Sequence, residues 1–148
     1  MLVYITSAIK FVVFNLLRNT IDLQGGDLMR VAVIGSRSAG NETLAMILRE
    51  LPAGCSEIIS GGAKGVDFFA KKAAGRLGLK YTCIRPRYQK YGRAAPLYRN
   101  NAIIEKADFV IAFWDGRSKG TRQAIACCIS RRKPFRIFLI NMRDMISI

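Results

Sequence analysis

From residue 29 onward, short apolar runs alternate with longer segments in which apolar residues recur every three or four positions. The apolar runs predict five strands, at residues 30–34, 57–60, 80–84, 108–114 and 136–140. The longer segments predict four helices, at residues 41–51, 67–77, 99–106 and 121–131, and Asn41 is placed to cap the first of them. Strands and helices that alternate in units of this size are typical of an α/β fold. We therefore expect a three-layer sandwich, with a mainly parallel sheet of about five strands between helices.

Residues 1–28 do not continue this pattern. The stretch 2–17 is mostly apolar but Lys10 interrupts it, and it is shorter than the roughly 20 apolar residues of a membrane-spanning helix. No basic segment precedes it and no small-residue cleavage site follows, so a signal peptide is not supported. We expect an amino-terminal appendage at 1–28, from an upstream start or loosely attached, and one domain at 29–148. A helix that binds a membrane surface or a partner is the alternative for the appendage.

The charge of the chain narrows the class of partner. Its 24 Lys and Arg residues outnumber 10 Asp and Glu, which gives a net charge of +14. Such an excess favours anionic partners, such as nucleotides, nucleic acids or acidic membrane surfaces, although it also serves solubility.

The chain has no histidine and no Cys-x-x-Cys pair, which removes the usual zinc sites and both Ser-His-Asp and Cys-His catalysis. We therefore predict no metal and no cofactor. The four cysteines predict buried thiols, which fits a reducing cytoplasm, where we place the protein: Cys55, Cys83, Cys127 and Cys128.

A glycine-rich stretch at residues 60–67, the glycine turn, joins the second predicted strand to the second predicted helix. A strand, a glycine turn and a helix start are the elements of an anion site, because glycines admit a phosphate close to the backbone and the first helical N–H groups point at it. The alternative is a tight turn that binds nothing. The candidate ligand-binding residues of this turn are Gly61, Gly62, Lys64, Gly65 and Asp67.

Other candidate residues follow the other strands. The carboxyl ends of parallel strands meet at one sheet edge, where ligands of such folds bind. Residues 118–121 resemble the glycine turn, being small, basic and at a predicted helix start, although Gly120 could serve only the turn and Thr121 only the cap. Two such turns favour a phosphate-bearing ligand. The candidates in these loops are Gly35, Ser36, Arg37, Arg99, Asn100, Ser118, Lys119, Gly120 and Thr121.

Residues 85–93 mix cations with aromatic side chains. Aromatic rings can stack on bases while cations hold phosphates, which suits a nucleotide or a single-stranded nucleic acid. Tyr88 and Tyr91 could equally pack this segment onto the domain. We expect Trp114, at a strand end, to pack at the rim of the core. The basic cluster at residues 131–133 is typical of a solvated helix end, and the alternative is that it extends a nucleic-acid surface.

Several of these segments together resemble the SLOG superfamily, and most closely its YspA-like (YpsA-related) Rossmann-like branch. The resemblance covers residues 29 to about 140. It implies a Rossmann-like fold and a site for a nucleotide or a nucleotide-derived ligand. The matching segments are Gly35-Ser36-Arg37, the glycine turn, Tyr91-Gly92-Arg93-Ala94-Ala95-Pro96, Arg99-Asn100, Ala107-Asp108 and residues 112–121.

Two relatives of this branch give alternatives. LOG phosphoribohydrolases use a PGGxGTxxE motif, and the matching residues 117–124 place Ala124 at the position of the catalytic glutamate, which weakens that reading. DNA-processing protein A binds single-stranded DNA and has a similar glycine turn, which ends in an acid as this one does at Asp67. Arg87 departs from the YspA-like pattern, in which an acidic residue is expected, and makes this loop more cationic.

We therefore expect binding or sensing of a nucleotide or nucleotide-derived ligand. The alternatives are single-stranded nucleic-acid binding and N-glycosidic hydrolysis. For hydrolysis Asp67 and Asp115 are the candidate catalytic carboxylates, although Asp67 more readily fixes the turn by accepting backbone hydrogen bonds. Whether the protein is an enzyme is left open, with binding favoured over catalysis. A membrane partner is disfavoured, and a homo-oligomer is left open.

Overall fold

The structure is a computed structural model that describes residues 28–141, so the appendage predicted at 1–28 lies almost entirely outside the described residues. Five strands form one sheet: β1 (Met29–Gly35), β2 (Cys55–Ser60), β3 (Lys80–Cys83), β4 (Phe109–Trp114) and β5 (Phe135–Leu139). Its helices are α2 (Glu42–Glu50), α3 (Val66–Leu77), α4 (Tyr88–Tyr91), the 3-10 turn η1 (Gly92–Ala94), α5 (Ala95–Lys106) and α6 (Lys119–Ser130).

All neighbouring strands of the sheet are parallel, and their order is β3-β2-β1-β4-β5. Parallel pairing requires crossover connections, and helices supply them. The strand order reverses at β1: the chain first builds outward through β2 and β3, then returns to the other side of β1 with β4. The predicted α/β Rossmann-like fold with five strands is confirmed.

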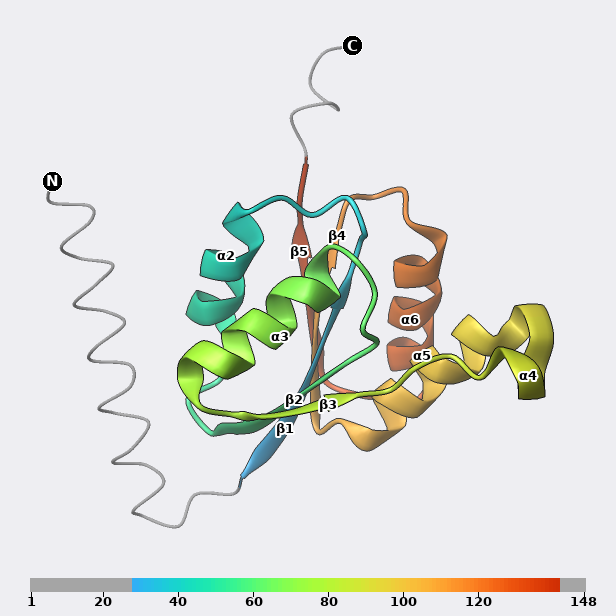
Figure 1. Ribbon diagram of the computed structural model, residues 1–148, viewed down its shortest axis with the longest axis horizontal. Helices are drawn as coiled ribbons and strands as arrows, with labels where there is room; N and C mark the ends of the chain where they lie inside the picture. The colour runs from blue at the N-terminus through green and yellow to red at the C-terminus, as the bar shows by residue number, and fades with distance from the viewer. Residues whose placement is uncertain (1–27, 142–148) are drawn as a thin grey trace, which may run out of the picture.

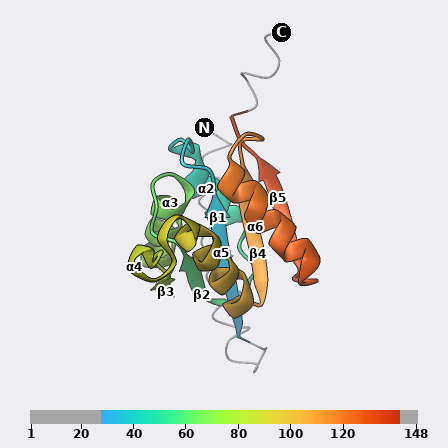
Figure 2. The same cartoon turned by 90° about the vertical axis from the view of Figure 1, so that its right-hand side faces the viewer.

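Helices cover both faces of the sheet (Figure 1). One core lies under α2 and α3, where Val33, Ile58 and Phe113 are inaccessible to solvent. The other lies under α5 and α6, which Figure 2 shows in front of the sheet, and includes Ala32 and Ile59. The central strands are apolar on both faces because each face is covered. Among residues 28–141, no helix is long and apolar enough to cross a membrane.

The segment after β3 differs most from the prediction. Residues 85–98 were expected to form a connection, but they contain α4, η1 and the first turn of α5. Helix α5 begins at Ala95, with Pro96 in its first turn, where a proline costs no hydrogen bond. Arg99 therefore lies one turn inside the helix and does not open it. Likewise, α6 begins at Lys119 instead of residue 121.

Two smaller expectations are wrong. Asn41 occupies the position before α2 but has helical backbone angles, and its side chain makes no capping bond. The N–H of Thr43 donates instead to the carbonyl of Gly40, at 3.1 Å. Cys83 is exposed, because β3 is an edge strand, whereas the other three cysteines are buried as expected.

Gly75, in the interior of α3, offers a direct test of the helix. A Cβ added there would meet no atom within 4 Å, and its φ is not in the left-handed region. We expect Gly75→Ala to raise the free energy of unfolding by about 0.5–1 kcal/mol, because alanine loses less backbone entropy in a helix. Urea denaturation followed by circular dichroism measures the change. A loss of stability would contradict the exposed helical environment of Gly75.

Candidate functional site

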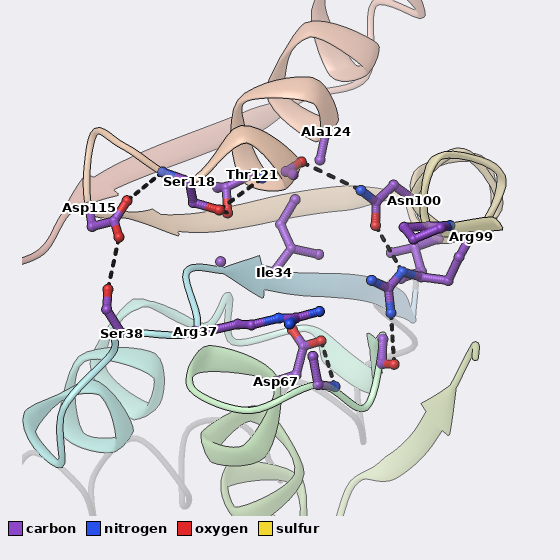
Figure 3. Close-up of a pocket in the computed structure, with 16 residues that line it drawn as sticks. Ile34, Arg37, Ser38, Asp67, Arg99, Asn100, Asp115, Ser118, Thr121 and Ala124 are labelled. Atoms are coloured by element: carbon purple, nitrogen blue, oxygen red, sulfur yellow. Dashed lines mark hydrogen bonds between the residues drawn. The ribbon is translucent and has the colours of Figure 1, made fainter. Parts of the chain in front are cut away.

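A pocket of about 400 Å³ opens at the sheet edge where the strand order reverses, between the carboxyl ends of β1 and β4. In open α/β sheets, the loops that follow the two strands at this switch point lead to helices on opposite faces of the sheet, which leaves a crevice between them. We call it the loop pocket (Figure 3). Its lining residues are Ile34, Gly35, Arg37, Ser38, Gly61, Ala63, Asp67, Pro96, Arg99, Asn100, Ile103, Asp115, Ser118, Gly120, Thr121 and Ala124.

Hydrogen bonds join the loops that follow β1 and β4. The N–H of Asp115 donates to the hydroxyl of Ser36 at 3.0 Å, and the hydroxyl of Ser38 donates to the Asp115 carboxylate at 2.8 Å. The other carboxylate oxygen accepts from the N–H groups of Arg117 and Ser118, at 2.9 and 2.8 Å. Asp115 therefore holds the wall of the pocket together, and its carboxylate is engaged on both oxygens.

These hydrogen bonds control the pKa of Asp115. Burial alone would raise it, but the donated bonds from Ser118, Arg117, Ser38 and Ser36 outweigh burial and lower the pKa from 3.8 to about 2. The carboxylate is therefore charged over the whole physiological range. A group that is already ionised and saturated with donors is poorly suited to proton transfer at neutral pH.

Asp115→Asn tests this role through pH. The folded-state pKa lies below the ordinary value, so the carboxylate stabilises the fold above about pH 4, and this contribution is lost as the pH falls toward 2. At pH 7 the variant is expected to lose on the order of 1–2 kcal/mol of unfolding free energy, after allowance for solvent screening. Urea denaturation at pH values from 7 to 2 measures this difference. The unfolding free energies of wild type and variant should converge as the pH falls; a difference that stays constant would contradict the assignment.

The glycine turn packs against the loop after β1 and against helix α5. A Cβ on Gly65, whose φ is +75°, would lie 2.4 Å from the carbonyl oxygen of Ser36 and 2.6 Å from the Cα of Arg37. A Cβ on Gly61 would lie 2.3 Å from a guanidinium nitrogen of Arg99. The backbone of the β1 loop therefore excludes a side chain at position 65, whereas a side chain at position 61 would displace the guanidinium of Arg99.

Asp67 stabilises the glycine turn through its buried carboxylate. Only 6% of its surface is exposed, and its carboxylate accepts from the N–H of Ala63 at 3.0 Å. Burial raises the pKa of Asp67, while the bond from Ala63 and the charge of Arg99 act in the opposite direction. The turn-fixing interpretation of Asp67 fits this contact.

Arg99 connects the turn to α5 and α6. Its guanidinium donates to the carbonyl of Gly61 at 2.9 Å and to the side chain of Asn100, also at 2.9 Å. Asn100 in turn donates to the side chain of Gln123 on α6, at 3.0 Å. The two helices and the turn are therefore held in a fixed arrangement around the pocket.

Sequence reasoning identified only part of the α5 wall of the pocket: Arg99 and Asn100 were candidates, whereas Pro96 and Ile103 were not. All four line the pocket, at the spacing that places side chains on one helix face. Proline at a helix start is the signal that could have extended this helix forward to include Pro96. Ile34, Ser38 and Ala63 also line the pocket and were not among the candidates, although each lies beside one in the sequence.

The start of α6 closes the pocket opposite the glycine turn. The Ser118 hydroxyl caps the helix by accepting from the N–H of Thr121 at 3.4 Å, so Ser118 and not Thr121 is the capping residue. No described residue accepts a hydrogen bond from the N–H of Gly120, which lines the pocket. This helix start therefore offers one backbone donor, the N–H of Gly120, and the positive end of its dipole at the cavity.

Five of the predicted ligand-binding residues lie outside the lining of the loop pocket. Ser36 is fully buried and holds Asp115, and Lys119 is exposed on the first turn of α6. The other three line a second hollow on the far side of the turn: Gly62, Lys64 and Gly65. Strand topology alone does not predict which cavity the Lys64 side chain faces, because the backbone changes direction at the glycines with positive φ on either side of it.

The loop pocket combines two guanidinium groups with one helix start. Arg37 and Arg99 enter it from opposite sides and point toward one another (Figure 3). Its two carboxylates are Asp67 and Asp115, both engaged with backbone N–H groups. Such a set of donors can hold a phosphate. Ala124 also lines the pocket, at the position given by the resemblance to the hydrolase glutamate, and supplies no acid or base.

The aromatic and cationic segment after β3 contains α4, an arm that contacts α5 and projects from the body of the domain (Figure 1). Tyr91 stacks on Tyr98 with ring centroids 4.0 Å apart, so it packs this arm onto α5. Tyr88 is exposed. Trp114 is half-buried at the end of β4, and its indole N–H donates to the carbonyl of Ser118, as expected of a rim residue. No group of three or more metal-ligating side chains gathers within the described part of the chain.

Comparison with known proteins supports the fold. A family model described as DNA recombination-mediator protein A matches residues 21–87, a little under half of the chain. Among solved structures, DNA processing protein A from Helicobacter pylori, described for its binding of single-stranded DNA, is similar at 22% identity, with a TM-score of 0.61. The match covers 77% of this chain and 67% of that one. The comparison with curated proteins gave no match. The expected resemblance to DNA-processing protein A is confirmed, and the YspA-like branch stays a prediction.

Proposed function

We propose that this protein binds single-stranded nucleic acid and holds one of its phosphates in the loop pocket. The observation that carries the proposal is the convergence of Arg37, Arg99 and the start of α6 on one cavity at the switch point of the sheet. A phosphate there would receive charged hydrogen bonds from guanidinium groups and neutral ones from the helix start.

Three further features support a strand over a lone anion. The net charge of +14 is far more than one phosphate requires. The α4 arm, which contacts the pocket-lining helix α5, carries cations together with the exposed ring of Tyr88, a combination suited to bases and their phosphates. The similar protein from Helicobacter pylori is described as a binder of single-stranded DNA.

Fluorescence anisotropy with a labelled oligodeoxythymidylate tests this function. We expect binding that tightens as salt is lowered, and the logarithm of affinity should fall against the logarithm of salt by about 0.7 for each phosphate contacted. A duplex of the same length should bind more weakly, because its bases are not available for stacking. The absence of affinity even at low salt would refute the proposal, because phosphate-driven binding is strongest there.

A free nucleotide or nucleotide-derived molecule is the second candidate ligand. A pocket of about 400 Å³ lies within the range of small-molecule sites, and the predicted YspA-like branch favours such a ligand. A thermal shift with a panel of nucleotides and ADP-ribose-like compounds tests it. A shift with one compound, and failure of oligodeoxythymidylate to bind, would favour this candidate over the strand. Hydrolysis is not proposed, since Ala124 replaces the acid that it needs.

A further inference from the structure

A second hollow of about 380 Å³ lies on the other side of the glycine turn from the loop pocket. Ala63 lines both cavities, so the turn itself is the wall between them. The β1 loop contributes to the same wall, since Ser38 lines the first cavity and Ala39 the second. A ligand that leaves the loop pocket over this wall enters the second hollow directly.

An aromatic side chain is held in this hollow without being buried. Phe68 is half exposed (50%), although it lies in the first turn of α3 beside the buried Phe69. The two rings meet edge to face, with centroids 5.3 Å apart, which anchors Phe68 against the core. An exposed ring held in a fixed position at the rim of a cavity is a surface on which a flat apolar group can stack.

The charges around Phe68 indicate what kind of flat group this is. The ammonium of Lys72 lies 4.8 Å from the centre of the ring, and Lys64 lines the same hollow. No carboxylate is among the described residues that line it. Both lysines are exposed and long enough to move to a phosphate. Cations around an aromatic ring suit a base that carries phosphates and disfavour an apolar helix of a protein partner.

We propose that the second hollow is a base-stacking subsite, in which a base of the bound strand stacks on Phe68 while Lys64 and Lys72 contact its phosphates. The strand then crosses the glycine turn between this subsite and the loop pocket. This inference rests on the proposed function and adds a second contact point to it. It also gives Lys64 a role, although Lys64 does not line the loop pocket.

Phe68→Ala, Phe68→Leu and Phe68→Tyr test the subsite by anisotropy with an oligodeoxythymidylate of 12 nucleotides. We expect Phe68→Ala to weaken affinity by about 5- to 150-fold, the range for loss of one stacked base. Phe68→Leu keeps an apolar side chain without a planar ring and should weaken affinity similarly, whereas Phe68→Tyr keeps the ring and should bind within about threefold of the wild type. The matched control is Ile129→Ala on α6, because Ile129 is also exposed (62%) but lines neither cavity.

The outcomes separate this inference from the proposed function. If the wild type binds and Arg37→Ala weakens binding, but Phe68→Ala and Phe68→Leu leave the affinity unchanged, the subsite is refuted and the proposed function stands. An equal loss in Ile129→Ala would also refute it, because the effect would not be local. If the wild type binds no oligonucleotide at low salt, the proposed function itself fails. Lys72→Ala should reduce the salt slope by about 0.7 while Phe68→Ala leaves the slope unchanged.

Discussion

Gly65→Ala is expected to lower the free energy of unfolding by about 2–5 kcal/mol. Two costs add: alanine is strained at the φ of +75°, and its Cβ would press on the backbone of Ser36 and Arg37. Separating the turn from the β1 loop would also displace Arg37 from the loop pocket. Urea denaturation and oligonucleotide titration of the same sample measure both effects.

Gly78→Ala is the matched control for this change. Gly78 also has a positive φ, +64°, but a Cβ there would meet no atom within 4 Å. It should therefore cost about 1 kcal/mol from backbone strain alone and leave oligonucleotide affinity unchanged. If Gly65→Ala were no more destabilising than Gly78→Ala, the β1 loop would not be packed against the glycine turn.

Removing either guanidinium of the loop pocket should weaken oligonucleotide binding by about 10- to 100-fold, the value of one charged hydrogen-bonding group to a phosphate. The two variants should differ in stability. Arg37→Ala should leave unfolding unchanged, because Arg37 is exposed, whereas Arg99→Ala should also destabilise the turn by removing the donor to Gly61. Arg99→Lys keeps the charge without the two-sided donor geometry and should fall between wild type and Arg99→Ala.

Arg76→Ala is the control for net charge in this experiment. Arg76 is exposed in the last turn of α3, at the opposite end of that helix from the glycine turn. Arg76→Ala removes the same charge as Arg37→Ala, but from a position outside the loop pocket, so it weakens only the long-range electrostatic attraction. Oligonucleotide affinity should therefore change by less than about threefold at 0.15 M salt. An equal loss in Arg76→Ala and Arg37→Ala would mean that binding follows total charge and does not depend on the loop pocket.

The fold was predictable because its signals are local. Apolar runs, helical spacing and glycines at strand ends each give one element, and parallel crossovers then restrict how the elements assemble. The start of α5 was missed because residues 85–98 carry few large aliphatic side chains, so that Pro96 in the first turn was the main local signal of a helix start. Asn41 had the right residue type for a cap, but the Gly40 carbonyl satisfies the helix start instead.

Much of the site was also predictable, since residues that follow parallel strands must meet at one edge. That argument alone placed three residues at one edge of the sheet, and all three line the loop pocket: Arg37, Arg99 and Ser118. Side-chain direction was not predictable in the same way. Lys64 faces the second hollow because two glycines with positive φ reverse the chain around it, and Ser36 is buried because the β4 loop packs on it. Both depend on contacts between segments far apart in the sequence.

The most direct measurement is a crystal structure of the protein bound to a short oligodeoxythymidylate. The account predicts a phosphate in the loop pocket, within hydrogen-bond distance of the Arg37 guanidinium and the N–H of Gly120, with the strand continuing over the glycine turn. A strand bound elsewhere, for example along the basic residues 131–133, with no phosphate in the loop pocket, would contradict the account.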